Sequence, residues 1–426
     1  MNNRKKILVN IYALSPTKGS EYAIGWNAVN VLAEKYLVYV LYGASGNDMG
    51  DTSEIEDLDK NGYNENINFI KVNPGFLARN INKLNIWGLW IFFSPAFYFY
   101  QLDVYNVAKK LHKEIGFDLI HQLNPTGFRE PGFLWKIDTP FVWGSISGTY
   151  ILSMDLINWK EWKSALNILF RNLIKWIYLN FSMRIKRAAL RSNVIIAVTK
   201  VDSNNILKYF KKESHVLPET FVKTNIIDLL PRNYLKLQLV WIGSIDSRKN
   251  LNLLIDALIG LQEYNWSLDI IGDGSLRQKM ETKVLQNNLS SKILFKGQMP
   301  RSQVKSILQS SDLHITTSLS EGTPTVLWEA FENGVPTISL NHCAMADIIC
   351  DKCGFLVSID VKNYDELVIK FRNEIKSIME NPTILTEKRQ SFCNCLEKYT
   401  ASSRILDIEK YYDEAITNFN QKNKAK

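Results

Sequence analysis

The chain has 426 residues, too many for one ordinary hydrophobic core, and its 46% hydrophobic and 22% charged residues are typical of a globular protein. Two domains are therefore expected, and no apolar run is long enough to predict a membrane-spanning helix. The net charge of +8 is modest and fits an anionic membrane surface, nucleic acid or a plain solvated surface. Five cysteines, all in the second half and without a secretory pattern, favour reduced thiols in a cytoplasmic setting.

Short apolar runs alternate with longer helical patterns along the chain. The N-terminal segment is basic and then apolar, and its apolar run is too short for a signal peptide. Fully apolar strands separated by helices predict parallel sheets with helices on both faces, so the expected class is α/β with two doubly wound domains. In chain order the predicted strands are 6–11, 37–42, 67–72, 117–122, 140–145, 193–199, 237–243, 267–274, 292–297, 312–318 and 336–340.

The alternation is interrupted around Pro218–Pro231, a stretch with two prolines and no clean period, which we interpret as a linker. We therefore expect Rossmann-like domains over residues 1–222 and 232–399. They would face a central cleft, with ligands at the carboxyl ends of the strands. An amphipathic helix over about 400–420 is expected to return and cover the first domain.

Two segments of the first half are rich in aromatic residues. Ile86–Tyr100 is short and interrupted by Pro95, whereas Trp159–Arg191 reads as a long helix or helix pair rich in Trp, Lys and Arg. Such helices suit an anionic bilayer surface, but a helix packed on the first domain with a solvated basic face explains the pattern equally well. The only Asp-x-Asp, Asp57–Asp59, lies in an acidic segment that we interpret as a loop rather than a metal site.

The segment 321–330, EGTPTVLWEA, places carboxylates at Glu321 and Glu329 on either side of a predicted helix start. Thr323 suits the N-cap and Pro324 the first helical position. The free amides and dipole of such a start attract an anion, whereas a carboxylate suits sugar hydroxyls. Phosphate and hydroxyls together describe a nucleotide-sugar. The competing interpretation is a charge pair that complements the helix dipole.

Two further loops of the second half follow predicted strands. Arg248 and Lys249 come after the strand 237–243, where two cations can neutralise a diphosphate, although adjacent Arg and Lys are usually a solvated loop pair. Gly272 and Gly274 form a turn between strand and helix. This is not a dinucleotide fingerprint, because Arg277 stands where the third glycine belongs.

The cysteines include Cys350-x-x-Cys353 and Cys393-x-Cys395, and four thiols can form a zinc site. The first pair lies at a turn before a strand and the second in a predicted helix. We therefore favour reduced structural thiols over a metal site.

In the first half, His121 ends a predicted strand, where a lone histidine is more often a satisfied core residue than a functional one. Other candidate residues of this half lie in loops that follow predicted strands. Gly19, Ser20 and Glu21 lie in the first strand–helix loop, Arg129 follows His121, and Ser145 and Ser147 lie in the loop WGSISG.

These motifs, in this order, resemble those of the retaining glycosyltransferases of family 4, the group 1 glycosyltransferases, which have the two-domain GT-B fold. The resemblance implies that Glu329 holds the donor ribose and that Glu321 contacts the donor sugar near its reacting carbon. Lys249 stands at the position of the family's lysine, whereas Ser244 replaces an arginine that is frequent there, so Arg248 is expected to supply that charge.

The resemblance also assigns the remaining residues. His121 would join Glu321, Arg248 and Lys249 in catalysis. The donor would be bound by Gly19, Gly243, Arg248, Lys249, Gly272, Gly274, Gly322, Thr323, Thr325, Val326 and Glu329. The acceptor side would comprise Glu21, Arg129, Ser145 and Ser147, of which both serines depart from the family's usual residues.

We therefore expect a peripheral, cytoplasmic enzyme that transfers a hexose from a UDP- or GDP-sugar to a lipid-linked oligosaccharide in O-antigen or capsule synthesis. The first domain would bind the acceptor and the second the donor. No metal or cofactor is expected, and the partners would be donor, acceptor and an anionic membrane surface. The alternatives are a GT-B epimerase or sugar-phosphate synthase and a non-catalytic nucleotide-sugar-binding protein. Nucleic acid is disfavoured, because no recognised binding module is present.

Overall fold

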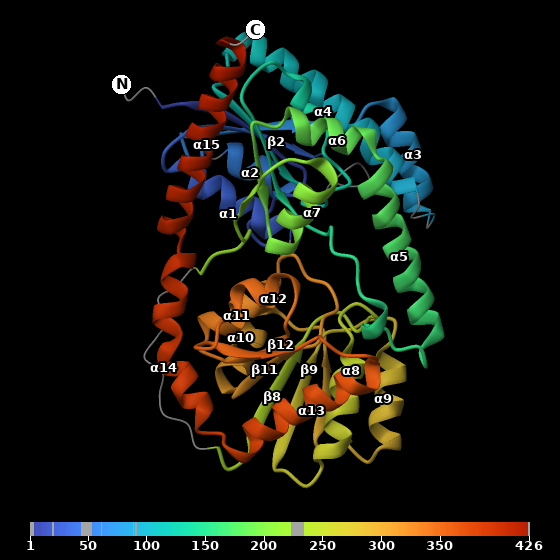
Figure 1. Ribbon diagram of the computed structural model, residues 1–426. Coiled ribbons are helices and arrows are strands. Elements are labelled where there is room, and N and C mark those ends of the chain that lie inside the picture. The colour runs from blue at the N-terminus through green and yellow to red at the C-terminus, as the bar shows by residue number, and fades with distance from the viewer. Residues whose placement is uncertain are drawn as a thin grey trace. The chain divides into compact units, whose positions relative to one another are not determined.

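The computed structural model describes residues 4–18, 21–43, 53–60, 62–87, 89, 92–222 and 234–424, so Gly19, Ser20 and most of the expected linker lie outside the described residues (Figure 1). The chain divides into two compact units, each built from discontinuous segments. The first comprises Met1–Thr149, Ile177–Thr220 and Ala401–Lys426, and the second comprises Tyr150–Trp176 and Phe221–Thr400.

In the described residues, the first unit contains a seven-stranded parallel sheet in the order β3-β2-β1-β4-β5-β6-β7. Its strands are β1 (Lys6–Ile11), β2 (Leu37–Gly43), β3 (Ile67–Val72), β4 (Leu119–Asn124), β5 (Phe141–Ile146), β6 (Val194–Ala197) and β7 (His215–Val216). Its helices are α1 (Glu21–Ala33), α2 (Ser53–Lys60), α3 (Phe76–Ile86), α4 (Phe93–Ile115), α6 (Met183–Arg191), α7 (Lys200–Phe210) and α15 (Ala401–Lys424).

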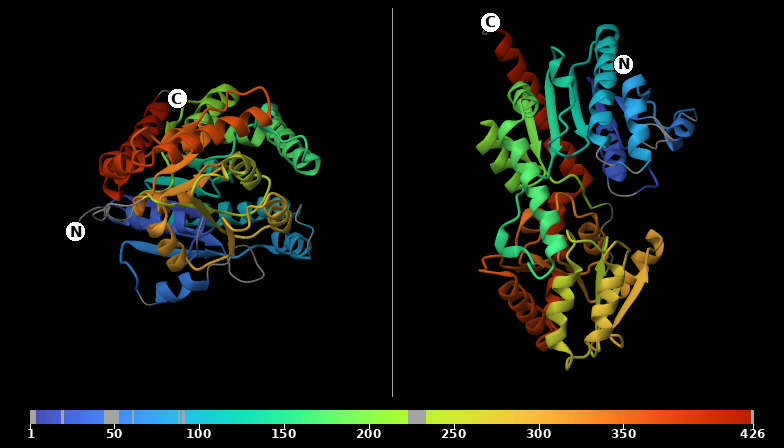
Figure 2. Two further views of the ribbon diagram at one scale, coloured as in Figure 1. Left: turned by 90° about the horizontal axis from the view of Figure 1, so that it is seen from below. Right: turned by 90° about the vertical axis from the view of Figure 1, so that its right-hand side faces the viewer.

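The central strands of this sheet are buried on both faces. In β1, the consecutive residues Ile7, Leu8 and Val9 are all inaccessible to solvent, as parallel strands covered on both sides require. Figure 2 shows the helices on both sides of the sheet, with α3 and α4 in blue on one side and α6 and α7 in green on the other.

One local prediction in this unit is wrong. The acidic segment that includes Asp57 and Asp59 is not a loop but forms helix α2. Glu54 in its first turn accepts hydrogen bonds of 2.6 Å from the hydroxyls of both Ser15 and Thr17. An acidic first turn complements the helix dipole, which favours a helix here despite the segment's low hydrophobicity.

The C-terminal helix α15 packs on the first unit. The Lys5 ammonium pairs with Asp413 at 2.6 Å, and Lys35 pairs with Glu409. Tyr412 is buried and reaches His121 of β4. The last helix of the chain therefore completes a core whose strands come from the first half.

In the described residues, the second unit contains a six-stranded parallel sheet in the order β10-β9-β8-β11-β12-β13. Its strands are β8 (Leu237–Ile242), β9 (Trp266–Ile271), β10 (Ile293–Gly297), β11 (Leu313–Thr316), β12 (Thr337–Leu340) and β13 (Gly354–Val357). Its helices are α8 (Leu251–Leu258), α9 (Arg277–Gln286), α10 (Arg301–Ser310), α11 (Thr325–Glu332), α12 (Cys343–Ile348), α13 (Tyr364–Glu380) and α14 (Ile384–Leu396). The predicted pair of parallel α/β domains is thus confirmed.

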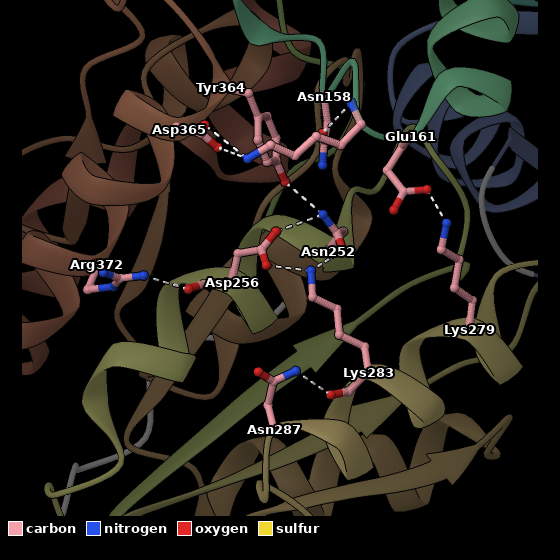
Figure 3. Close-up of polar contacts among 11 residues, drawn as sticks. Asn158, Glu161, Asn252, Asp256, Lys279, Lys283, Asn287, Tyr364, Asp365 and Arg372 are labelled. Atoms are coloured by element: carbon pink, nitrogen blue, oxygen red, sulfur yellow. Dashed lines mark hydrogen bonds and ion pairs between the residues drawn. The ribbon is translucent and has the colours of Figure 1, made fainter.

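The segment Tyr150–Trp176, expected in the first domain, belongs to the second unit, and that part of the predicted division is wrong. It contains most of helix α5 (Trp162–Phe181). Leu156 and Ala165 are buried in the second unit's core. Lys160 pairs with Asp365 of α13 at 2.8 Å, and Figure 3 shows Glu161 reaching Lys279 of α9. The predicted helix pair is confirmed, as α5 and α6, but amphipathic pattern alone does not identify the core on which a helix packs.

Candidate functional site

A buried ion-pair cluster lies where β8 and β11 end in the second unit. The Glu321 Oε1 atom lies 2.6 Å from the Arg248 guanidinium and 2.6 Å from the Lys249 ammonium. Only 9% of the Glu321 side chain is exposed, against 32% of Arg248 and 16% of Lys249. The structure therefore brings together three of the four residues expected to be catalytic, on two loops separated by more than seventy residues.

The charge state of Glu321 depends on these cations. Burial, the largest single influence, raises the pKa of its carboxyl group, but Lys249, Arg248 and a hydrogen bond from Ser318 together lower it further than burial raises it. The net pKa lies below the usual value, so Glu321 is a carboxylate at neutral pH. It can accept hydrogen bonds and hold both cations in place.

Asp246 fixes the loop that carries the two cations. Its Oδ1 atom accepts hydrogen bonds from the backbone amides of Arg248 at 2.9 Å and Lys249 at 2.8 Å. The Arg248 carbonyl accepts from the Leu319 amide at 2.8 Å, and the Lys249 carbonyl accepts from the Thr317 hydroxyl at 2.9 Å. The sequence analysis missed Asp246, although an aspartate two residues before the cations is a signal for such a turn.

The glycine turn after β9 packs against this loop. Gly272 has a φ of 129°, and a Cβ atom there would lie 1.9 Å from the Gly243 carbonyl oxygen. A Cβ atom at Gly274 would lie 2.5 Å from the Ile245 carbonyl oxygen. Both positions therefore require glycine so that the two loops can approach. This packing accounts for the glycines whether or not their amides also contact a ligand.

Helix α11 begins one residue later than predicted. Pro324 is the N-cap, with a ψ of 84° that lies outside the helical range, so Thr323 does not occupy the cap position. The N-cap residue makes no side-chain hydrogen bond to this end of α11. The amides at the helix start, at Thr325 and Val326, are therefore not capped in that way. Glu329 lies half-buried within the helix, and Gly322 lies in the loop between Glu321 and the helix start.

Two histidines that the sequence analysis did not select lie near this cluster. His342 Nε2 donates to the Ser318 carbonyl at 2.9 Å, and its ring lies 5.4 Å from that of Tyr150. Burial lowers the pKa of His342, partly opposed by Ser318 and Glu321. Burial and then Lys249 lower the pKa of His314, in β11, to about 3. Both imidazoles are therefore neutral at pH 7. Nothing in their local sequence signals this position.

His121, in the first unit, is buried within β4, and its proposed role in catalysis remains a prediction. Its Nε2 donates to the Gly144 carbonyl at 2.6 Å, and its Nδ1 accepts from the Tyr412 hydroxyl at 2.7 Å. Only 3% of the residue is exposed, and burial lowers its pKa to about 4, opposed by the hydrogen bond to Gly144. Both ring nitrogens thus have hydrogen-bond partners within the first unit.

The expected acceptor-side residues gather in part at one edge of the first unit's sheet. The Thr126 amide donates to Glu21 Oε1 at 2.9 Å, and the Ser147 amide donates to the Thr126 carbonyl at 2.8 Å. Burial raises the pKa of Glu21, opposed by the bond from Thr126. Ser145 is half-buried at the end of β5, and Arg129 is exposed, with its guanidinium 5.8 Å from the centre of the Tyr178 ring.

A basic cavity adjoins the Glu321 cluster within the second unit. Arg248 lines it together with Arg171 and Lys175 of α5. The Lys175 ammonium donates to the Tyr150 carbonyl at 2.7 Å, which fixes its position. Three cations around one cavity attract an anion such as phosphate. The sequence analysis missed this arrangement because it placed α5 in the other unit.

Part of the chain is similar to a known protein family. Residues 224–394 match the family model "Glycosyl transferases group 1". The matched segment is less than half of the chain and lies within the second unit. An uncharacterized glycosyltransferase of Haemophilus influenzae is 21% identical to it over 392 residues, which cover 89% of this chain and 97% of the relative.

A second relative, from Campylobacter jejuni, is 32% identical over 151 residues, or 33% of this chain and 41% of the relative. It is named GalNAc-alpha-(1->4)-GalNAc-alpha-(1->3)-diNAcBac-PP-undecaprenol alpha-1,4-N-acetyl-D-galactosaminyltransferase. Among solved structures, the apo lipopolysaccharide outer core galactosyltransferase WaaB matches with a TM-score of 0.64 and 14% identity, over 97% of this chain and 99% of its own. This likeness confirms the predicted GT-B fold. Within the described residues, no helix is sufficiently long and apolar to cross a bilayer.

The lowered pKa of Glu321 predicts a specific pH dependence of stability. Because the folded-state pKa is depressed, the ionised carboxylate stabilises the protein above its unfolded-state pKa, and this contribution is lost as the pH falls through the folded-state value. Wild type should therefore be more stable than Glu321→Gln at neutral pH. The difference should shrink between about pH 6 and pH 3, measured by urea unfolding.

The exposed Glu397→Gln serves as the control, since its difference from wild type should be small across this range. A wild-type advantage over Glu321→Gln that stays constant with pH would show that the ionised pair does not stabilise the fold.

Proposed function

We propose that this protein is a glycosyltransferase, a retaining, metal-independent hexosyltransferase that uses a UDP- or GDP-sugar donor and a lipid-linked oligosaccharide acceptor in cell-surface polysaccharide synthesis. The observation that carries the donor part is the cluster of Glu321 with Arg248 and Lys249. Two fixed cations suit a diphosphate, and a carboxylate accepts hydrogen bonds from sugar hydroxyls. The match to the group 1 family supports the same reading.

In the proposed reaction, the bond between the donor sugar's C1 and a diphosphate oxygen breaks, and its electron pair leaves with the nucleoside diphosphate. The acceptor hydroxyl forms the new bond to C1 on the same face and transfers its proton to the departing diphosphate. Arg248, Lys249 and the first amides of α11 offset the charge that grows on the leaving group. Since protein groups supply this positive charge, the reaction needs no metal ion.

Glu321 and Glu329 take different roles in this proposal. Glu321 is tied to both cations, so it positions them while its carboxylate accepts from a hydroxyl of the transferred sugar. Glu329 lies one helical turn beyond the anion-binding start of α11, where a carboxylate can accept from both hydroxyls of the ribose. Glu321 would thus bind the transferred sugar and Glu329 the ribose of the donor, with the phosphates bound between them.

The acceptor part of the proposal draws on the relative from Campylobacter jejuni, whose name specifies a PP-undecaprenol-linked glycan. An acceptor of that kind carries a diphosphate next to a lipid. The basic cavity formed by Arg171, Lys175 and Arg248 suits the diphosphate. Helix α5 exposes an apolar surface that suits the lipid part of such an acceptor.

One face of α5 exposes large apolar side chains at helical spacing: Trp162 (62%), Leu166 (56%), Phe170 (55%) and Leu173 (52%). Lys163 and Arg171, on the same helix, are also exposed. Apolar and basic residues exposed together suit the interface of an anionic bilayer. We therefore propose peripheral binding to the cytoplasmic face of the plasma membrane through α5. In Ile86–Tyr100 of the first unit, Ile86, Trp87, Leu89, Phe93 and Tyr98 are also exposed, and we propose that this segment contacts the membrane as well.

Donor binding is tested by thermal unfolding with UDP-, GDP-, ADP- and dTDP-sugars in EDTA. One nucleotide class should raise the melting temperature by about 5 °C at a hundredfold excess over its Kd, because a ligand that binds only the native state stabilises it. Glu329→Ala should abolish the shift. Glu332→Ala, on the same helix, should retain it.

An equal shift in wild type and Glu329→Ala would place the donor elsewhere. Product analysis then separates the alternative activities. An epimerised sugar would indicate an epimerase, and a sugar phosphate formed without a glycan acceptor would indicate a sugar-phosphate synthase. No turnover of a bound donor with any acceptor would indicate a nucleotide-sugar-binding protein.

Membrane binding is tested by sedimentation with vesicles containing anionic lipid. The combined variant Trp162→Ser, Leu166→Ser and Phe170→Ser should lose most of its binding, since each replacement removes apolar area from the interface. Leu285→Ser removes a side chain of similar exposure, 68%, from α9 and should bind as wild type does. Equal binding of both variants would contradict the assignment of α5 as the contact surface.

A further inference from the structure

Three cysteine side chains of the second unit lie close together, two from one turn and one from a helix. Cys350 lies between α12 and β13, Cys353 directly precedes β13, and Cys395 lies in α14. The Cys350 sulfur is 3.0 Å from that of Cys395 and 3.5 Å from that of Cys353, and all three lie within 4.8 Å of one another. The sequence analysis placed the two cysteine pairs in different elements, which the structure brings together. The Cys393 side chain lies outside the described residues.

The turn from Cys350 to Gly354 directs a backbone amide at one of the sulfurs. The Cys353 sulfur accepts a hydrogen bond from the Cys350 amide at 3.3 Å. The Cys350 carbonyl accepts from the amides of Cys353 and Gly354, each at 3.1 Å. Amide donors aimed at sulfur stabilise negative charge on it, which a metal-bound thiolate carries.

The position after Cys353 admits only glycine. A Cβ atom at Gly354 would lie 2.3 Å from the Thr337 carbonyl oxygen and 2.7 Å from a methyl carbon of Ile349. The turn is therefore held tightly against β12, and the Cys350 and Cys353 sulfurs keep a fixed separation. Preorganised ligands lower the cost of binding a metal, because little must be ordered when it arrives.

The sulfur separations fit a tetrahedral thiolate site. A Zn–S bond of about 2.3 Å gives sulfur–sulfur separations of about 3.8 Å in a tetrahedron. The observed separations of 3.0 and 3.5 Å therefore need to open by less than about 1 Å. Cys-x-x-Cys is also the spacing with which two ligands of one zinc ion commonly occur.

We propose that Cys350, Cys353 and Cys395 bind one Zn²⁺ ion as three thiolates, with water as the fourth ligand. On binding, three S–H bonds break, three Zn–S bonds form and the protons pass to solvent, so no oxidant or reductant is needed. The ion joins the α12–β13 turn to α14. Its neighbours in the same apolar cluster include Trp328 and Phe331 of α11, the helix that carries Glu329. The site is structural and takes no part in sugar transfer.

The test uses the full chain, reduced and stripped of metal by a chelator. Zn²⁺ is titrated against a competing chromophoric chelator, and Co²⁺ is added separately to report thiolate ligation through its sulfur-to-metal charge-transfer absorption. Wild type should bind one Zn²⁺ per chain and show the Co²⁺ band. Cys350→Ser and Cys395→Ser, both half-exposed positions, should each weaken binding by about 100-fold or more. Cys343→Ser, a thiol outside the cluster, should bind as wild type does.

Three results would overturn the proposal. The first is the absence of stoichiometric Zn²⁺ binding to the reduced wild type. The second is unchanged affinity in both serine variants, provided that their thermal unfolding without metal matches wild type. The third is a Cys350–Cys395 disulfide in the purified protein together with no Zn²⁺ binding after its reduction, which would make the pair a redox site instead. Donor binding by the metal-free protein is independent of all three.

Discussion

The second unit depends on keeping one nearly buried carboxylate ionised. Burial alone favours the protonated form of Glu321, and the two cations at 2.6 Å together with a hydrogen bond from Ser318 reverse that preference. The cations hold this position because Asp246 orders their loop and Thr317 and Leu319 bind it to the loop after β11. The same bonds leave two positive groups fixed before any ligand enters. Catalysis by charge stabilisation requires such preorganisation, since no energy is then spent on moving the groups.

Much of the fold and of this cluster could be predicted from the sequence. Strands such as β1 and β8 are apolar on both faces, which only parallel sheets with two helical layers accommodate. Loops that follow parallel strands lie at one edge of the sheet, and the structure places Arg248 and Glu321 in two such loops. The sequence is compatible with both a core role and a functional role for His121, and its hydrogen-bond partner Tyr412, 291 residues away in the chain, was not predictable from the local pattern. The packing of α5 on the second unit was likewise not predictable, because it depends on contacts between residues far apart in the chain, such as Lys160 with Asp365.

The placement of α5 changes how the proposed acceptor would be held. Its basic residues Arg171 and Lys175 share a cavity with Arg248, so one unit supplies cations on both the donor side and the proposed acceptor side. The same helix exposes the apolar face proposed to meet the membrane. An acceptor with a diphosphate and a lipid would thus contact two adjacent parts of one helix. A zinc ion bound by the thiol cluster, which packs against Trp328 and Phe331 of α11, would further stabilise the second unit.

The most direct test of the account is transfer itself, in EDTA, from the nucleotide-sugar that binds to a lipid-diphosphate-linked glycan, with the new linkage assigned by NMR. The account predicts a product with the donor's anomeric configuration. It also predicts a rate reduced about 100- to 1,000-fold in Lys249→Met, because one charge-stabilising group is lost. The exposed Lys236→Met should leave the rate unchanged. Inverted configuration, or full activity in Lys249→Met, would contradict the account.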